Sequence, residues 1–406
     1  MKYLFFRAFP ALSHRNYQLW ASGQFVSLIG TWIQMIAQGW LVLELTHAAL
    51  WVSIIAALNS LPILLLTLFG GLIVDRFSKR KVLFIAEFSA MILAFTLGFL
   101  TIFHLVTVWH IAVLAFLLGV VSAIDMPARL AFSFEMVDKK SLSSALALNA
   151  GMFNGARVVG PGLAGYLIAF VGLGGAFLVN GISFIAVLIA MLFMRTTPSK
   201  PVIHPHPFLA IRQGLSYAFS NVIIRRLLIF SGFISIFGWS YMVILPVVVK
   251  NTFHMDASGL GLFNAVAGLG ALIGSFLISG LSRMFGPWKF ILTGSFLFAF
   301  SLFIFSFTTN LYIALLCLFG IGLGLIMQFA TINSAIQHVV VDSLRGRVMS
   351  VYTLMFLGMT PFGSLQIGFL SQQLGTAWAL RISSLVVLGI SLLFLLKRVK
   401  RPGLEN

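Results

Sequence analysis

The chain has 406 residues, of which 60% are hydrophobic and only 9% charged, and its mean hydropathy is +1.06. A soluble domain carries about 25% charged residues, because water must solvate its surface. The composition therefore excludes a soluble enzyme, a disordered chain and a disulfide-stapled secreted domain. It predicts an all-α integral membrane protein, with room for roughly twelve spans at about 20 residues each.

The net charge of +17 would suggest nucleic acid as a partner if the protein were soluble. In a membrane protein, Lys and Arg instead collect in cytoplasmic loops and set the orientation of the chain. The predicted partner is therefore the lipid bilayer, and nothing indicates nucleic acid or a required protein partner.

Apolar runs separated by turn residues and charges mark twelve predicted spans. They cover residues 18–44, 50–74, 82–103, 107–129, 142–170, 174–194, 223–249, 258–282, 288–308, 311–338, 347–374 and 376–396.

One long interruption, residues 195–221, separates the sixth predicted span from the seventh. It opens with a stretch that contains four prolines, which cannot lie inside a helix, and continues with an amphipathic stretch around residues 211–219. We predict two six-helix bundles at residues 1–195 and 222–406. The linker between them, residues 196–221, is expected to contain a short amphipathic helix.

The basic residues fall almost entirely on one predicted side of the membrane. They lie before the first span, after the last, and in alternate connections between, such as the run from Lys79 to Lys81. Because Lys and Arg favour cytoplasmic loops, we expect both termini in the cytoplasm and the chain in a plasma membrane, the inner membrane of a bacterium.

The two halves also repeat weakly. The second span of each half, within residues 51–76 and 258–283, ends in an arginine. Spans five and eleven both carry Gly and Pro in the middle, at Gly160 and Pro161 and at Gly358, Pro361 and Gly363. Six-plus-six repeats with interrupted helices in matching positions are typical of secondary transporters, whose site lies between the halves.

A stripe of polar residues follows one face of span one at helical spacing. Polar side chains facing lipid are costly, so the stripe faces protein or a water-filled cavity. Two interpretations stay open: the stripe lines a cavity, or it provides hydrogen bonds between helices. Span ten shows a shorter version. The residues are Gln24, Ser27, Thr31, Gln34 and Gln38 in span one, and Gln328, Thr331, Ser334 and His338 in span ten.

Arg157 lies in the middle of span five, with Asn154 and Pro161 on the same broad face. An unpaired Arg at a helix centre in the bilayer costs at least ~2.5 kcal/mol, so it needs a partner or a cavity. Arg157 is either an anion contact or a gate residue, or it is a structural tie to carbonyls that Pro161 leaves free.

The few acids include Asp75 at the end of span two and Asp125 near the end of span four. These two form either surface ion pairs or a charge-relay gate. Glu44 and Glu87 are expected at the membrane interface. No nucleotide-binding loop or zinc-protease motif occurs, and the histidines are scattered, so no catalytic residue, metal site or cofactor is predicted.

Several runs carry a resemblance to the major facilitator superfamily. GLIVDRFSKRK, from Gly71 to Lys81, resembles its loop between helices two and three, with Ser78 in place of a glycine. GARVVGPGLAG resembles its antiporter motif in helix five, with Ala164 in place of a glycine. The matching motif positions are Gly155, Gly160, Pro161 and Gly165.

The similarity covers almost the whole chain. The stretch from DMPAR, beginning at Asp125, through SALALNAGMFNGARVVGPGLAG closely resembles the exporter branch that includes enterobactin and macrolide exporters, the transmembrane secretion effectors. The resemblance implies twelve helices, alternating access and proton-driven export of a small amphipathic molecule such as a siderophore or drug. An importer or exchanger of a metabolite on the same fold is the alternative, and an integral-membrane enzyme fits less well because clustered catalytic groups are missing.

For such an exporter, the predicted substrate cavity combines the polar residues with a few aromatic ones. Its members are Gln24, Thr31, Gln34, Gln38, Asn154, Arg157, Trp239, Tyr241, Gln328 and Thr331, and Trp32 can add apolar surface. The predicted cytoplasmic gate consists of Asp75, Arg76, Arg80 and Asp125, whose charges lie at one membrane depth and can form alternating ion pairs.

Overall fold

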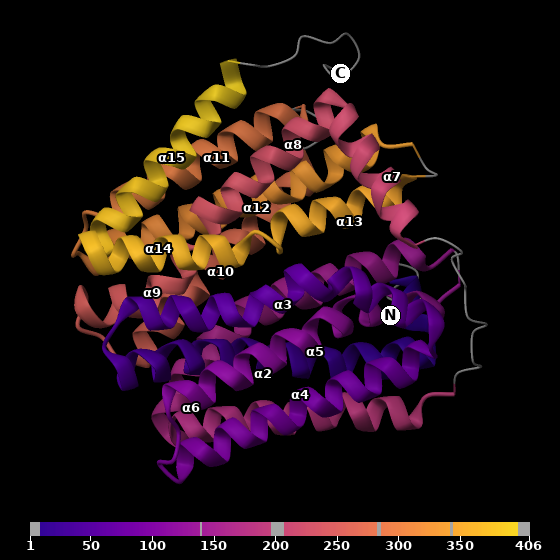
Figure 1. Ribbon diagram of the computed structural model, residues 1–406, viewed down its shortest axis with the longest axis horizontal. Helices are drawn as coiled ribbons and strands as arrows, with labels where there is room; N and C mark the ends of the chain where they lie inside the picture. The colour runs from indigo at the N-terminus through magenta and orange to yellow at the C-terminus, as the bar shows by residue number, and fades with distance from the viewer. Residues whose placement is uncertain (1–8, 139, 196–206, 282–285, 342–343, 397–406) are drawn as a thin grey trace. The chain divides into compact units, whose positions relative to one another are not determined.

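The computed structural model describes residues 9–138, 140–195, 207–281, 286–341 and 344–396, which form helices joined by short turns (Figure 1). Part of the predicted linker, residues 196–206, lies outside this description, as do Lys139, Arg283 and both chain ends. Contacts divide the chain into two units. Unit 1 comprises Met1–Leu45 and Leu61–Pro205, and unit 2 comprises Thr46–Ser60 and His206–Asn406.

Unit 1 contains a short 3-10 helix, η1, and four long helices besides part of α3. Their bounds are η1 Pro10–Ser13, α2 Arg15–Thr46, α4 Lys79–Ile102, α5 Val108–Glu135 and α6 Leu142–Phe193. The helix α3, Ala49–Arg76, contributes to both units, because its first turns group with unit 2. Ser53 on these turns lies against Gly368 of unit 2.

Unit 2 contains the remaining helices, one of which is interrupted by a π-helical segment, η2. Their bounds are α7 Pro207–Ser220, α8 Val222–Phe233, η2 Ile234–Trp239, α9 Tyr241–Asn251, α10 Ala257–Leu281, α11 Pro287–Phe305, α12 Leu311–Val339, α13 Arg345–Phe356, α14 Thr360–Leu374 and α15 Thr376–Leu396. The short α7 packs on α13 where Gly214 meets Arg347.

The long helix α6 is a hairpin. A straight helix of its 52 residues would extend roughly 78 Å. Contacts at its two ends exclude a straight helix. Near the start of α6, Ser144 Oγ accepts from Ala11 N at 3.3 Å. Just past the end of α6, the Arg195 carbonyl accepts from Asn16 Nδ2, five residues after Ala11. The two ends of α6 therefore lie together, and the chain reverses at Gly172, whose φ of 71° is accessible to glycine.

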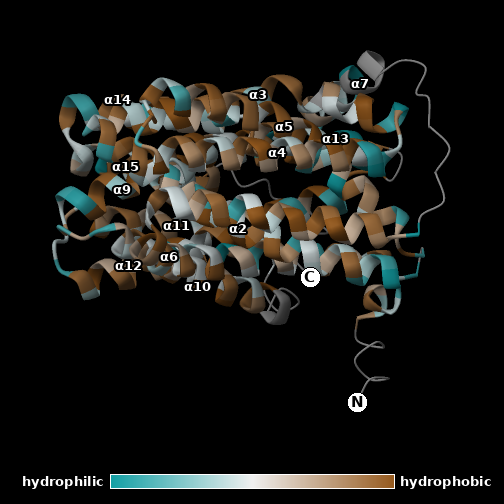
Figure 2. Cartoon of the chain, turned by 90° about the horizontal axis from the view of Figure 1, so that it is seen from below, coloured by the Kyte–Doolittle hydropathy of each residue, from teal (hydrophilic) through white to brown (hydrophobic). Residues whose placement is uncertain are grey.

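The helices have the lengths and apolar surfaces of membrane spans. Within the described residues, eleven helices are long and apolar enough to cross a bilayer, and α6 accounts for two crossings, consistent with twelve. Phe170 is 86% exposed and Tyr312 81%, as expected for side chains that face lipid. Hydrophilic colour gathers at helix ends and turns in Figure 2. The chain is a multi-pass membrane protein of the predicted all-α class.

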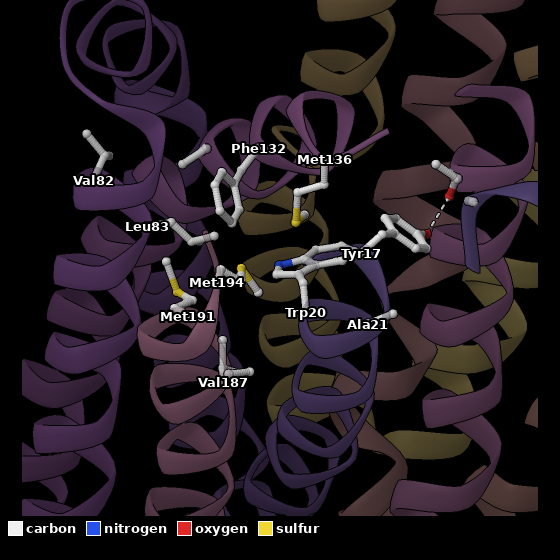
Figure 3. Close-up of a cluster of buried hydrophobic side chains, with 14 of the residues drawn as sticks. Tyr17, Trp20, Ala21, Val82, Leu83, Phe132, Met136, Val187, Met191 and Met194 are labelled. Carbon is white, nitrogen blue, oxygen red and sulfur yellow. Dashed lines mark hydrogen bonds between the residues drawn. The ribbon is translucent and has the colours of Figure 1, made fainter. Parts of the chain in front are cut away.

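An apolar core closes one end of unit 1, which we call the basic end because Lys79, Arg80 and Lys81 lie there. Trp20 on α2 lies among Met136 and Met194 (Figure 3). Tyr17, one turn earlier, donates its hydroxyl to the carbonyl of Ala145 at 3.0 Å. The first turns of α2 are thereby fixed to the start of α6.

The predicted break at Pro161 is wrong, because α6 runs through this proline as continuous helix. A proline inside a helix loses one backbone hydrogen bond, a loss that neighbouring helices can compensate. Gly160 supplies the close neighbour: a side chain there would collide with Trp32 and the Ile29 carbonyl of α2. The motif thus packs two helices together and leaves the helix unbroken.

The interruption predicted in span eleven is present. Residues 357–359 separate α13 from α14, and the π-helical η2 lies beside this break. Ser235 in η2 donates its hydroxyl to the Phe356 carbonyl at 2.5 Å, which occupies a carbonyl that the break leaves free. Two irregular segments therefore support each other in unit 2.

Asp256 caps the start of α10. Its Oδ1 accepts from the backbone N–H of Ser258 at 2.9 Å and from the Ser258 hydroxyl, and the hydroxyl bond above all holds the pKa of Asp256 below its ordinary value. This stabilisation is present above the ordinary pKa and is lost as the pH falls through the lower folded value.

We expect Asp256→Ala to lower the free energy of unfolding by about 1 kcal/mol, as for a lost N-cap, and Asp256→Asn to lower it less. Thermal unfolding of the purified protein in detergent measures both. The difference between wild type and Asp256→Ala should vanish in acid. Equal melting at neutral pH would show that this cap contributes nothing.

Candidate functional site

Three charged side chains form a buried cluster between α4 and α5 in unit 1, which we call the charged triad. Glu87 on α4 is only 1% exposed, and its Oε1 accepts from Arg129 Nη2 at 3.2 Å. The same nitrogen donates to Asp125 Oδ2, one turn earlier on α5, at 2.5 Å. One guanidinium therefore serves two carboxylates.

Glu87, which was expected at the membrane interface, is buried between helices. Because α4 begins at Lys79, Glu87 lies eight residues, or roughly 12 Å, along the helix and faces α5. Arg129, the last residue of the predicted span 107–129, lies inside α5, since that helix continues to Glu135. The spacing of Asp125 and Arg129, four residues apart on one helix face, was the available signal for this cluster.

The predicted gate residues are distributed over several contacts at the basic end. Asp75 is half-buried in the last turn of α3, and the neighbouring Arg76 is exposed. Arg80 Nη2 donates to the Met191 carbonyl at 2.5 Å, while Asp125 pairs with Arg129. Asp125 therefore pairs with Arg129 on its own helix, and Arg80 contacts the backbone at the end of α6.

The polar stripe of α2 has mixed surroundings. Gln34 is buried and its Oε1 accepts from Asn180 Nδ2 of α6 at 2.6 Å, a contact of the interhelical kind. Gln24 is 1% exposed, and neither side-chain polar atom has a hydrogen-bond partner. Thr31 is exposed and bonds its own helix at the Ser27 carbonyl, and Gln38 is half-buried.

Arg157 is buried in the first arm of α6, with 5% of its surface exposed. Two glycines near Arg157 show where it lies along α2, because Gly155 faces the ring of Phe25 and Gly160 faces the carbonyl of Ile29. Arg157 therefore lies at the level of the middle of α2. Asn154, one turn away, bonds the Ala150 carbonyl of its own helix at 2.8 Å.

In unit 2, an aromatic cluster surrounds the break between α13 and α14. Trp239 of η2 lies edge-on to Phe356 and to Phe329 of α12, with ring centroids 5.5 and 6.2 Å away. Phe329 and Phe356 are themselves 4.2 Å apart. We call these three residues the aromatic cluster, and Trp239 remains half-buried at its edge.

The other predicted residues of unit 2 lie deeper. Tyr241 is 1% exposed and its ring is 6.2 Å from Phe298. Gln328 is fully buried, and its Oε1 accepts from the Ser295 hydroxyl at 2.9 Å, while Thr331 is 6% exposed. Sequence reasoning missed Phe329 and Phe356, because phenylalanine occurs 41 times in the chain and no spacing singles these two out.

No group of three or more His, Cys, Asp or Glu side chains among the described residues is arranged to hold a metal ion.

Comparison with known proteins gives full-length matches. A major facilitator superfamily model described as transmembrane secretion effector matches residues 7–405. The chain is similar to the staphyloferrin A transporter of Staphylococcus aureus, at 27% identity over 92% of this chain and 94% of that protein. It is also 27% identical to the multidrug efflux pump Tap of Mycolicibacterium fortuitum, over 90% and 92% of the two chains.

Further similarity extends to a siderophore exporter and to solved transporters. The enterobactin exporter EntS of Citrobacter koseri is 21% identical, over 93% of this chain and 91% of its own. The fold matches that of a bacterial homologue of the lysosomal transporter Spinster, with a TM-score of 0.76, 14% identity and coverage of 96% and 99%. A bacterial ferroportin homologue matches with a TM-score of 0.72 and 17% identity over 95% and 99%.

Proposed function

Since the chain belongs to the transmembrane secretion effector family of the major facilitator superfamily, we propose that it exports a small amphipathic molecule, a siderophore or a drug-like compound. The observation that carries this proposal is the set of full-length relatives, which are named as transporters or exporters of siderophores or drugs. The chain is a membrane transporter and not an enzyme.

In the proposed cycle, the bundles at residues 1–195 and 222–406 alternate between inward and outward access. Both termini are in the cytoplasm and the membrane is the bacterial inner membrane. Proton antiport, which the family resemblance implies, is the proposed energy source, and the sequence contains no nucleotide-binding loop.

Each unit offers groups that can bind a substrate. The edge of the aromatic cluster offers Trp239 as a flat apolar surface for an aromatic or amphipathic molecule. Gln328 still has an unpartnered Nε2, and Gln24 has two unpartnered polar atoms, which can serve a polar substrate. Arg157 supplies the positive charge that would favour an anion.

The test uses inside-out membrane vesicles with an acidic interior and three probes: staphyloferrin A, enterobactin and the dye ethidium. We expect at least one probe to accumulate in vesicles that contain the protein, and a protonophore to abolish the accumulation. Trp239→Ala should lower transport about tenfold, equivalent to about 1.4 kcal/mol of lost binding. Trp378→Ala, which changes an aromatic side chain that is 56% exposed in unit 2, is the matched control.

Accumulation of the probe only in right-side-out vesicles would support the alternative, an importer or exchanger on the same fold. No accumulation of any probe in either orientation would contradict transport of these substrate classes.

Asp75 tests the proposed cytoplasmic gate. We expect Asp75→Asn to insert and fold normally but to favour the inward-open state, because the lost charge weakens ion pairs that hold the gate shut. Transport should fall sharply at unchanged membrane abundance, measured by probe efflux from loaded cells and by blotting. Normal efflux at normal abundance would leave Asp75 an ordinary surface carboxylate.

A further inference from the structure

The charged triad has an excess of one acid over base. Glu87 and Asp125 share the single guanidinium of Arg129, so the three groups carry a net charge of −1 when all are ionised. Glu87 Oε2 and Asp125 Oδ1 are both buried without a hydrogen-bond partner. A buried carboxylate oxygen without a donor is costly, and a bound proton removes that charge.

Apolar residues seal the triad on both sides along the helices. Toward the basic end lie Leu83, one turn before Glu87, and Phe132, one turn after Arg129, both fully buried. On the other side Ala90 and Phe184 form a second apolar cluster. The triad is therefore a charged layer in a medium of low dielectric constant, where one uncompensated charge has a large effect.

The helices packed around the triad carry few other charges. On α3, which packs on α5 where Gly70 meets Ala123, the last turn holds Asp75 and Arg76. α5 contributes Asp125 and Arg129, and the second arm of α6, residues 173–193, contains no titratable side chain. On α4 itself, Arg80 lies two turns before Glu87 and donates to the Met191 carbonyl, and Lys81 lies six residues before Glu87. Among the described residues, Arg129 is the one base that pairs with Glu87 or Asp125, so a bound proton can neutralise the excess acid.

Of the two acids, the geometry favours Glu87 as the proton acceptor. Asp125 makes the shorter contact with Arg129, 2.5 Å against 3.2 Å, and keeps 12% of its side chain exposed. Glu87 makes the longer contact and is 1% exposed. Arg129 and Asp125 then form a neutral pair, and Glu87 remains as the carboxylate that can take up and release a proton.

We propose that Glu87 is the group that carries the coupling proton, with Arg129 and Asp125 as its positioning partners. This rests on the proposed function of proton antiport. A hydronium ion from the acidic side gives its proton to Glu87 Oε2, leaving water, and the triad becomes neutral. Release of that proton restores the charge of −1, which favours the conformation in which water reaches α4 and α5.

The first experiment is independent of any substrate. Infrared difference spectra of the purified full chain between acidic and alkaline pH should show the carboxyl C=O band of a buried acid in wild type. The band should be absent in Glu87→Gln and retained in Glu135→Gln. Glu135 is a matched control, because it lies on α5 and pairs with Lys79 at 2.5 Å but is 25% exposed. A band unchanged in Glu87→Gln would overturn the proposal.

The second experiment measures coupling in proteoliposomes with ethidium and enterobactin as probes. We expect Glu87→Gln to lower pH-driven accumulation and the accompanying proton flux about tenfold or more. Exchange of labelled for unlabelled probe, which needs no net proton movement, should fall less, and Glu135→Gln should match wild type. Wild-type proton flux in Glu87→Gln would overturn the proposal. If wild type transports neither probe but shows the Glu87 band, the proposed function fails while the proton site stands.

Discussion

We expect Gly322→Ala to destabilise the protein by about 3 kcal/mol or more, above the usual range for an overpacked side chain. Gly322 of α12 faces the carbonyl of Ala267 on α10, and an added Cβ would overlap that backbone oxygen. A flexible side chain could move aside, but the backbone of a packed helix cannot do so without separating α10 from α12. The expected result is loss of the monodisperse peak in detergent gel filtration.

Gly389→Ala is the control for this substitution. Gly389 lies inside α15 of the same unit, and a Cβ there meets nothing within 4 Å. Alanine is a better helix former than glycine, so this variant should be unchanged or more stable by up to about 1 kcal/mol. Equal melting temperatures of the two variants would show that α10 and α12 can separate without loss.

Arg129→Met should be the other severely destabilising change. It leaves Glu87 and Asp125 buried without their common base. Removing one partner of a buried ion pair typically lowers the free energy of unfolding by about 3–5 kcal/mol, and we expect a loss of that size. We expect low membrane abundance and a lower melting temperature in detergent.

Replacing all three residues of the charged triad distinguishes the effect of an uncompensated buried charge from the effect of altered packing. In Glu87→Leu/Asp125→Leu/Arg129→Met, no charge is left buried, and well-packed apolar replacements of ion pairs are often neutral or stabilising. The triple variant should therefore recover most of the stability that Arg129→Met loses. If it is as unstable as Arg129→Met, the triad matters for packing and not for charge compensation.

Sequence patterns predicted the class of fold because membrane spans depend on long apolar runs. The predicted spans 142–170 and 174–194 correspond to the two arms of α6, and glycine between them was the signal for the reversal at Gly172. The break in span eleven was also predicted, since Gly358 and Pro361 both disfavour helix. Pro161 carries the same signal but lies in continuous helix, because its neighbour Gly160 allows α2 to pack closely.

The charged triad could be predicted only in part. The acids and bases are few enough to be found at once, but which ones pair depends on how α4 and α5 face each other. That rotation is set by side-chain packing around Leu83 and Phe132, which hydropathy along one helix does not contain. The aromatic cluster was harder to predict, because it joins three segments distant in sequence around two irregular turns.

The hairpin of α6 has a consequence for how the polypeptide enters the bilayer during synthesis. Between Arg157 and Arg195 the chain contains no charged residue, and its reversal at Gly172 needs no hydrophilic loop. The translocation machinery therefore has no charged segment to carry to the far side, and both arms can partition into lipid together as one unit. Lengthening the turn with charged residues would force two separate insertion events, so this is the connection least suited to an inserted tag.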